Sequence, residues 1–138
     1  MQKKAVISIS SMQMNDKDQV VEVVTPGEFH IEEDSFKAIY EESEISGMAG
    51  TTTTVVIESG KVKLVRKGST ETVMVFENNG SNVCLYNTPY GMLELTTNTK
   101  LINIYMNEDG GAVKINYDLV VAGQDPIHTS LSLKEKVI

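Results

Sequence analysis

The sequence has few of the residues that would tie it to a disulfide scaffold or a metal centre. It contains one cysteine, two histidines and no tryptophan among 138 residues. The single Cys84 cannot form an intramolecular disulfide. His30 and His128 lie far apart in sequence, and neither has a second ligand at a recurrent zinc spacing. We therefore expect no disulfide, no metal site and no cofactor.

Long apolar runs and a basic charge balance are also missing. No stretch approaches the roughly 20 apolar residues of a membrane-spanning helix, and the start of the chain alternates Val, Ile and Ser instead of forming a signal segment. Aromatic residues make up 6% of the chain, too few for the girdles of a membrane barrel. The net charge of −7 repels phosphate backbones. These features predict a cytoplasmic protein that binds neither membranes nor nucleic acids.

The pattern that is present is an alternation of apolar and polar residues, which indicates β-strands. Residues 36–43 fit helical and strand spacing alike, and their context favours a strand. In all we expect about ten strands, near residues 5–14, 20–25, 28–33, 36–43, 51–58, 62–67, 71–77, 83–88, 92–106, 112–122 and 129–137.

Turn residues separate these strands. Pro26-Gly27 predicts a turn between 20–25 and 28–33, and Asn79-Gly80 is a strong hairpin signal because both residues tolerate positive φ. The strands at 92–106 and 112–122 form the longest predicted hairpin, with Glu108 to Gly111 as its turn. That hairpin exceeds the usual strand length and would let two copies pair, so a homodimer is one expectation.

Numerous strands, short turns and the lack of a convincing helix favour an up-and-down barrel or a sandwich over an α/β fold. The length and the 41% hydrophobic content fit one domain, residues 1–138. Closure into a barrel would remove exposed strand edges. We therefore predict an all-β fold, a single antiparallel calycin- or lipocalin-like β-barrel of about 8–10 strands with little or no helix.

A series of short motifs runs through the chain from about Tyr40 onward: Tyr40-Glu41-Glu42, Gly47 with Thr52-Thr53-Thr54, Val65-Arg66 with Gly68, Met74 with Phe76, Tyr86 through Gly91, and Tyr117. In order and approximate spacing they are similar to those of the small bacterial YwiB-like family, a domain of unknown function. The resemblance weakens over roughly the first thirty residues. It implies a calycin-like antiparallel barrel with no established activity.

One group of residues is the candidate site. If Tyr40 faces inward on its strand, Glu42 shares that face, and a buried carboxylate there needs a cationic partner such as Arg66. Tyrosines add broad apolar faces with a hydroxyl, and small-ligand pockets combine apolar walls with a few polar groups. The predicted ligand-binding residues are Tyr40, Glu42, Arg66, Tyr86, Tyr90 and Tyr117.

Two classes of function fit these residues. The first is a noncatalytic barrel that binds a small, partly apolar ligand in its interior or mouth, which requires space among Met74, Phe76, Tyr86 and Tyr117. The second is a protein-interaction module whose tyrosines fill the barrel and whose Arg–Glu pair fixes strand register. No motif joins a nucleophile, a base and oxyanion donors, so we assign no catalytic residue. Cys84, between two apolar residues, has the character of a small hydrophobe.

Overall fold

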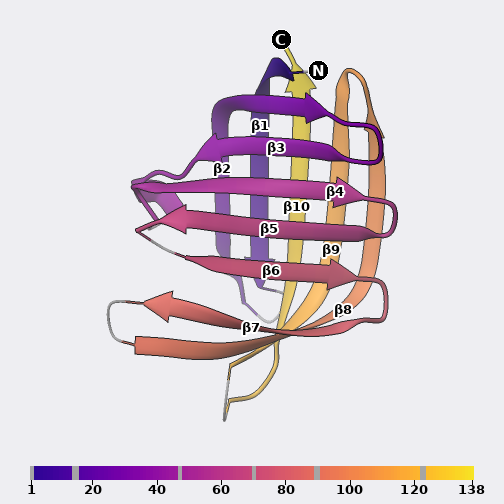
Figure 1. The fold of residues 1–138 in the computed structure, drawn as a ribbon. Coiled ribbons are helices and arrows are strands. Elements are labelled where there is room, and N and C mark those ends of the chain that lie inside the picture. The colour runs from indigo at the N-terminus through magenta and orange to yellow at the C-terminus, as the bar shows by residue number, and fades with distance from the viewer. Residues whose placement is uncertain (1, 14–15, 47, 70, 89–90, 122–123) are drawn as a thin grey trace.

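A computed structural model describes residues 2–13, 16–46, 48–69, 71–88, 91–121 and 124–138. Within them ten strands form one antiparallel sheet, and one short 3-10 helix, η1 (Glu44–Ser46), follows β3. The strands are β1 (Gln2–Gln13), β2 (Asp16–Ile31), β3 (Phe36–Glu41), β4 (Thr51–Glu58), β5 (Lys61–Gly68), β6 (Thr72–Glu77), β7 (Ser81–Thr88), β8 (Gly91–Asn107), β9 (Gly110–Val121) and β10 (Ile127–Val137). The predicted all-β antiparallel barrel is confirmed (Figure 1). Among the described residues, no helix is long and apolar enough to cross a membrane.

The strands follow one another around the barrel with one break. The order of neighbours is β6-β5-β4-β3-β2-β1-β10-β9-β8-β7, so the first strand pairs with the last and the two chain ends lie together (Figure 1). Strands β6 and β7 are the edges of the described sheet. The hydroxyl of Thr97 on β8 lies between them, 3.3 Å from the carbonyl oxygen of Val75 and 3.4 Å from that of Asn82. The barrel is therefore nearly closed, and we call the gap between β6 and β7 the seam.

The sheet folds into two layers that cross. Strands β3 to β6 form a front layer, and β1, β9 and β10 form a back layer behind it (Figure 1). The two longest strands, β2 and β8, bend and take part in both layers. In β8 the bend coincides with a shift of register between Thr99 and Leu101, because an extra residue in one strand kinks it.

The bend in β2 corrects one prediction. Pro26-Gly27 does not reverse the chain, since β2 is continuous through both residues and pairs with Val6 and Ala5 of β1. Proline has no N–H to donate to a ladder. It is accepted at position 26 because β2 pairs with β3 only over Glu28 to Ile31, so the β3 side of Pro26 needs no ladder hydrogen bond. A Cβ atom on Gly27 would lie 2.5 Å from the carbonyl oxygen of Ile39, so the glycine permits the close approach of β3 at the corner.

The Asn-Gly signal marks a turn but not a paired hairpin. Asn79 has a φ of 57°, as such a turn requires, yet the strands on either side of it, β6 and β7, share no ladder in the described sheet. The turn bonds to β8 instead: the side-chain oxygen of Asn78 accepts from the Ile102 amide at 3.0 Å, and Gly80 accepts from the Thr99 amide at 2.9 Å. These two contacts hold the turn against the register shift of β8.

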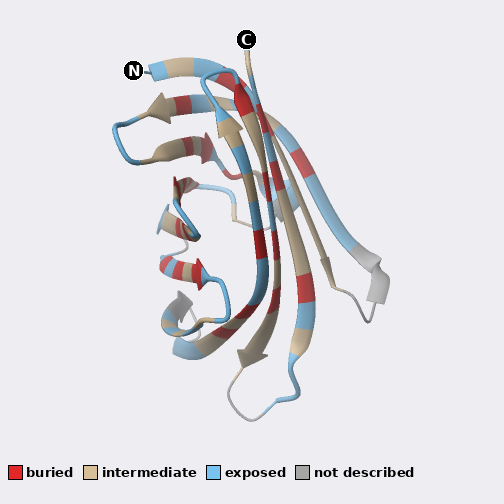
Figure 2. Ribbon diagram, turned by 90° about the vertical axis from the view of Figure 1, so that its right-hand side faces the viewer, coloured by how far each residue is buried: buried red, intermediate tan, exposed pale blue. Residues whose placement is uncertain are grey.

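Side chains on the inner face line up in rows because the ladders keep neighbouring strands in register. In the front layer one row is Phe36, Ile57, Val62 and Phe76, and the next is Ala38, Val55, Leu64 and Met74. Buried and less buried positions alternate along these strands, strictly so in β4 (Figure 2). The apolar core therefore lies between the two layers, as the period of two predicted.

Candidate functional site

The third row of the front layer is polar. Tyr40 is opposite Thr53, which is opposite Arg66, which in turn is opposite Thr72. Tyr40, Thr53 and Thr72 are buried, while Arg66 is partly accessible. The inner face thus changes from apolar to polar along the direction from Phe36 to Tyr40 on β3.

A cavity of about 300 Å³ is bordered by two residues of this row, Tyr40 and Arg66. Four of the predicted residues line it together: Tyr40, Glu42, Arg66 and Tyr117. The other lining residues are mainly apolar and come from both layers: Ile9, Ser11, Val21, Val23, Met48, Leu64, Met74, Phe76, Leu95, Leu119 and Leu131. Of the residues beside which a ligand-binding interior requires space, Met74, Phe76 and Tyr117 line this cavity. The Tyr117 ring packs against Phe76 with centroids 4.8 Å apart.

The two remaining predicted residues lie at or beyond the limits of the described part of the chain. The backbone of Tyr86 pairs with Leu93 in the ladder between β7 and β8, but its side chain lies outside the described part. Tyr90, like Pro89, lies outside the described residues. A role for Tyr86 and Tyr90 in the site stays a prediction.

Arg66 and Glu42 form the charged pair of the cavity, as predicted. Arg66 Nε lies 3.9 Å from Glu42 Oε1, and the two side chains are 20% and 3% exposed. The same Glu42 oxygen accepts a hydrogen bond of 2.7 Å from Thr53. Because 3.9 Å is too long for a hydrogen bond, the buried Nε–H of Arg66 has no hydrogen-bond partner. The formal charges of Glu42 and Arg66 balance, but the Nε–H of the guanidinium remains an unused hydrogen-bond donor.

Both tyrosines of the cavity are neutral groups at ordinary pH. Burial raises the pKa of Tyr40 far above its usual range, and the negative charge of Glu42 raises it further while Arg66 opposes the shift. Burial also raises the pKa of Tyr117, against the opposing effects of Arg66 and of a hydrogen bond with Thr129. Their hydroxyls therefore act as hydrogen-bonding groups and not as charges.

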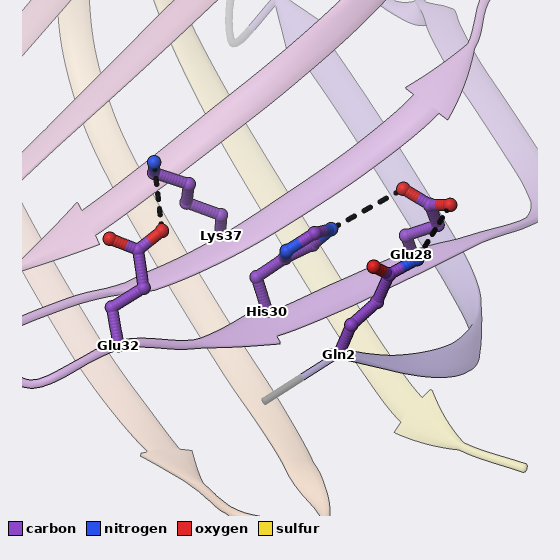
Figure 3. A network of polar contacts seen from close by, with 5 residues as sticks. All are labelled: Gln2, Glu28, His30, Glu32 and Lys37. Atoms are coloured by element: carbon purple, nitrogen blue, oxygen red, sulfur yellow. Dashed lines mark hydrogen bonds and ion pairs between the residues drawn. The ribbon is translucent and has the colours of Figure 1, made fainter.

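The histidines and the cysteine lie elsewhere. His30 Nε2 contacts Glu28 Oε2 at 3.3 Å, within an outer group in which Gln2 donates to Glu28 at 2.8 Å (Figure 3). His128 contacts Asp118. Cys84 is a free thiol beside the seam, 3.9 Å from the Thr72 hydroxyl. Within the described residues no three or more His, Cys, Asp or Glu side chains gather as metal ligands.

Several important positions escaped the sequence interpretation. Thr53, which donates to Glu42, is not among the predicted site residues, although it shares the inward parity of Val55. Met48 follows η1 and carries no periodic signal. Glu135 is a second buried acid, 5% exposed, with no hydrogen-bond partner for either carboxyl oxygen. Its alternation with Leu133 was a signal that could have revealed it.

Comparisons with known proteins agree with this fold and give no activity. A crystal structure of the ywiB protein from Bacillus subtilis matches with a TM-score of 0.88 at 22% identity, covering 99% of this chain and 93% of that one. The sequence of the "Uncharacterized beta-barrel protein YwiB" from Bacillus subtilis (strain 168) is 29% identical over 112 residues, which is 80% of this chain and 77% of that protein.

The family model DUF1934, described as a domain of unknown function, matches residues 7–133. The match begins within β1, so the similarity includes the N-terminal strands in which the motifs of the sequence are weakest. The match covers more than half of the chain. This protein therefore belongs to the DUF1934 family.

Proposed function

We propose that this protein is a noncatalytic barrel that binds a small, partly apolar molecule in the cavity between its layers. The observation that carries the proposal is the cavity itself, whose volume of about 300 Å³ is at the lower end of the range for small-molecule pockets. Apolar walls with a few converging polar groups are the usual composition of such pockets. Arg66, Tyr40 and Tyr117 supply the polar groups.

The chemistry of the lining supports binding more than catalysis. The tyrosines are neutral, and the one acid in the lining already accepts from Thr53 and faces Arg66. A general base needs a free acceptor within reach of substrate, and Glu42 is almost fully covered. These groups can orient a ligand by hydrogen bonding without transferring a proton.

A thermal-shift screen with a variant that fills the cavity tests this proposal. Leu119 lines the cavity and is only half-buried, so Leu119→Trp places an indole in the ligand space without rebuilding the core. The matched control is Leu101→Trp, at a position of β8 that is 41% exposed. We expect compounds that raise the melting temperature of the wild type and of Leu101→Trp but not that of Leu119→Trp. Equal shifts in all three proteins, or none for a broad panel of small amphipathic compounds, would contradict the proposal.

The second candidate is self-association through the seam. Exposed apolar side chains flank it on both sides, among them Val73, Val83, Leu85 and Met92. Strand edges without ladder partners can add a further strand, and each copy carries both edges, so a two-fold pairing would match them. Sedimentation velocity of the wild type and of Leu85→Lys tests this candidate. A wild-type protein that stays monomeric at high concentration would rule the dimer out.

We propose two finer assignments as well. A calycin-type barrel is supported by the sequential strand order around a ligand-sized interior. A cytoplasmic location is supported by the free thiol of Cys84, which suits a reducing compartment. Fractionation of the cells that make the protein tests the location.

A further inference from the structure

Among the described residues, the formal charges that line the cavity sum to zero. Glu42 and Arg66 are the acidic and basic side chains of that described lining, and they face each other at 3.9 Å. An added charge in an apolar cavity needs its own counter-charge, because desolvation is costly. A carboxylate placed here would leave one negative charge unbalanced, in a chain that already carries a net charge of −7.

Accessibility separates the two members of the pair. The Arg66 side chain is 20% exposed, whereas that of Glu42 is 3% exposed and already accepts from Thr53. A cationic ligand would meet a carboxylate whose charge Arg66 already balances and which already accepts a hydrogen bond from Thr53. The Arg66 side chain lines the cavity, and its guanidinium N–H groups only donate hydrogen bonds. The ligand therefore needs an acceptor and no charge.

A small apolar space adjoins the same residues. It measures about 30 Å³, shares Tyr40, Leu64 and Arg66 with the main cavity, and is otherwise lined by aliphatic side chains such as Val62 and Ile115. A space of this size holds a group about as large as one water molecule, and its apolar walls favour a methyl group. A ligand with its hydrogen-bond acceptor near Arg66 would thus have a methyl group on one side of that acceptor and a longer apolar part on the other.

We infer that the cavity takes a neutral molecule with a carbonyl oxygen, directed at the Arg66 guanidinium, and with its apolar body against Leu64, Met74 and Phe76. This inference rests on the proposed function and specifies its ligand class. The Glu42–Arg66 pair disfavours organic anions and cations alike, because either one would add an unbalanced charge to the cavity. A methyl ketone is the simplest compound with this chemistry.

Methionine methyl resonances give a local measure of binding. Met74 and Met48 line the cavity, whereas Met92 on β8 is 61% exposed and lies outside it. The full-length protein, labelled with ¹³C at its methionine methyl groups, is titrated with 2-octanone, octanoate and octylammonium. We expect 2-octanone to shift the Met74 signal with an affinity about tenfold higher than that of either ion, the factor for a difference of about 1.4 kcal/mol.

We expect the loss of the Glu42 charge to reverse the preference for 2-octanone over octanoate. Glu42→Gln leaves Arg66 without its counter-charge, so octanoate should become the preferred ligand through a guanidinium–carboxylate pair. The matched control is Glu41→Gln, because Glu41 accepts from Thr52 at 2.7 Å just as Glu42 accepts from Thr53, but on the exposed face. The control should keep the wild-type ranking.

The outcomes separate the inference from the proposed function. Octanoate or octylammonium binding as tightly as 2-octanone to the wild type would overturn the inference while leaving the ligand-binding cavity in place. No shift of Met74 with any of the three compounds would count against both. The wild-type ranking decides the inference by itself if Glu42→Gln does not fold.

Discussion

Two glutamates are buried in this barrel, and their surroundings differ completely. Glu42, directly after β3, receives a hydrogen bond from Thr53 and faces Arg66. Glu135, on β10 of the back layer, has no hydrogen-bond partner for either carboxyl oxygen. The ladders place Glu135 beside Ile7 and Gly111, neither of which offers a polar side chain.

The difference shows how the surroundings of a buried carboxyl group decide whether it can carry a charge. A buried carboxylate is stabilised by a hydrogen-bond donor and a counter-charge, and Glu42 has both beside a cavity. A buried acid without partners avoids its charge, and burial raises the pKa of Glu135 to about 8. Only the first acid lines the cavity, whereas the second makes stability depend on pH.

The largest expected effect is the pH dependence that Glu135 imposes. Its pKa in the folded protein, about 8, lies above the ordinary value of 4.5, so the folded state binds more protons between these values. The free energy of unfolding therefore falls as the pH rises from about 5 to about 8, by about 4 kcal/mol at about 1.4 kcal/mol per pH unit. Urea unfolding of the wild type and of Glu135→Gln at several pH values measures this. Glu135→Gln should be nearly flat in that window; parallel profiles would refute the assignment.

Removing the counter-charge of Glu42 should have the next largest effect. Arg66→Met leaves a buried carboxylate without its cation and should lower the free energy of unfolding by about 3 kcal/mol at pH 7, the lower end for a broken buried pair because Arg66 is partly accessible. Adding Glu42→Gln should restore most of the loss. If the double variant is as unstable as Arg66→Met, the damage comes from packing and not from charge.

A smaller effect is expected at the hydroxyl that holds Glu42. Thr53→Val removes the 2.7 Å hydrogen bond at nearly constant volume and should destabilise the protein by about 2 kcal/mol, as for a bond to a charged group. Thr52→Val removes an equally short bond to Glu41 on the exposed face and should change stability by less than about 0.5 kcal/mol. Equal losses of stability in Thr53→Val and Thr52→Val would show that burial does not make the hydrogen bond to Glu42 stronger than the one to Glu41.

The smallest effect is expected on the outer surface. Lys37 Nζ lies 2.8 Å from Glu32 Oε1, closer than Arg66 lies to Glu42, and the hydrogen bond with Lys37 lowers the pKa of Glu32 (Figure 3). Water screens this exposed pair, so Lys37→Met should leave the midpoint of urea unfolding unchanged. A clear loss of stability would mean that distance matters more than burial in this protein.

The sequence predicted what depends on strand parity. Alternation placed Tyr40 and Glu42 on the inner face and suggested Arg66 as the partner, and the ladders from β3 to β5 bring these residues together. The same alternation assigns Glu135 to the inner face with Leu133, but no prediction was made for Glu135, which lies between two lysines. A local pattern shows which way a side chain points and not what it meets there.

The features that depend on contacts distant in sequence were not predictable. Pro26-Gly27 is a turn by local preference, yet it forms a corner because β1 pairs with the strand on both sides of it. The turn at Asn79 bonds to β8 and not across a hairpin, because the bulge of β8 supplies its partners. The volume of the cavity likewise depends on how two crossed layers pack, which no single strand encodes.

Native mass spectrometry of the freshly purified protein tests the central claim, a ligand-binding interior, most directly. The account predicts that part of the protein carries one small neutral molecule, released on denaturation and missing from Leu119→Trp. Protein that is bare in every preparation, and stays bare after incubation with 2-octanone under conditions that preserve weak complexes, would contradict it.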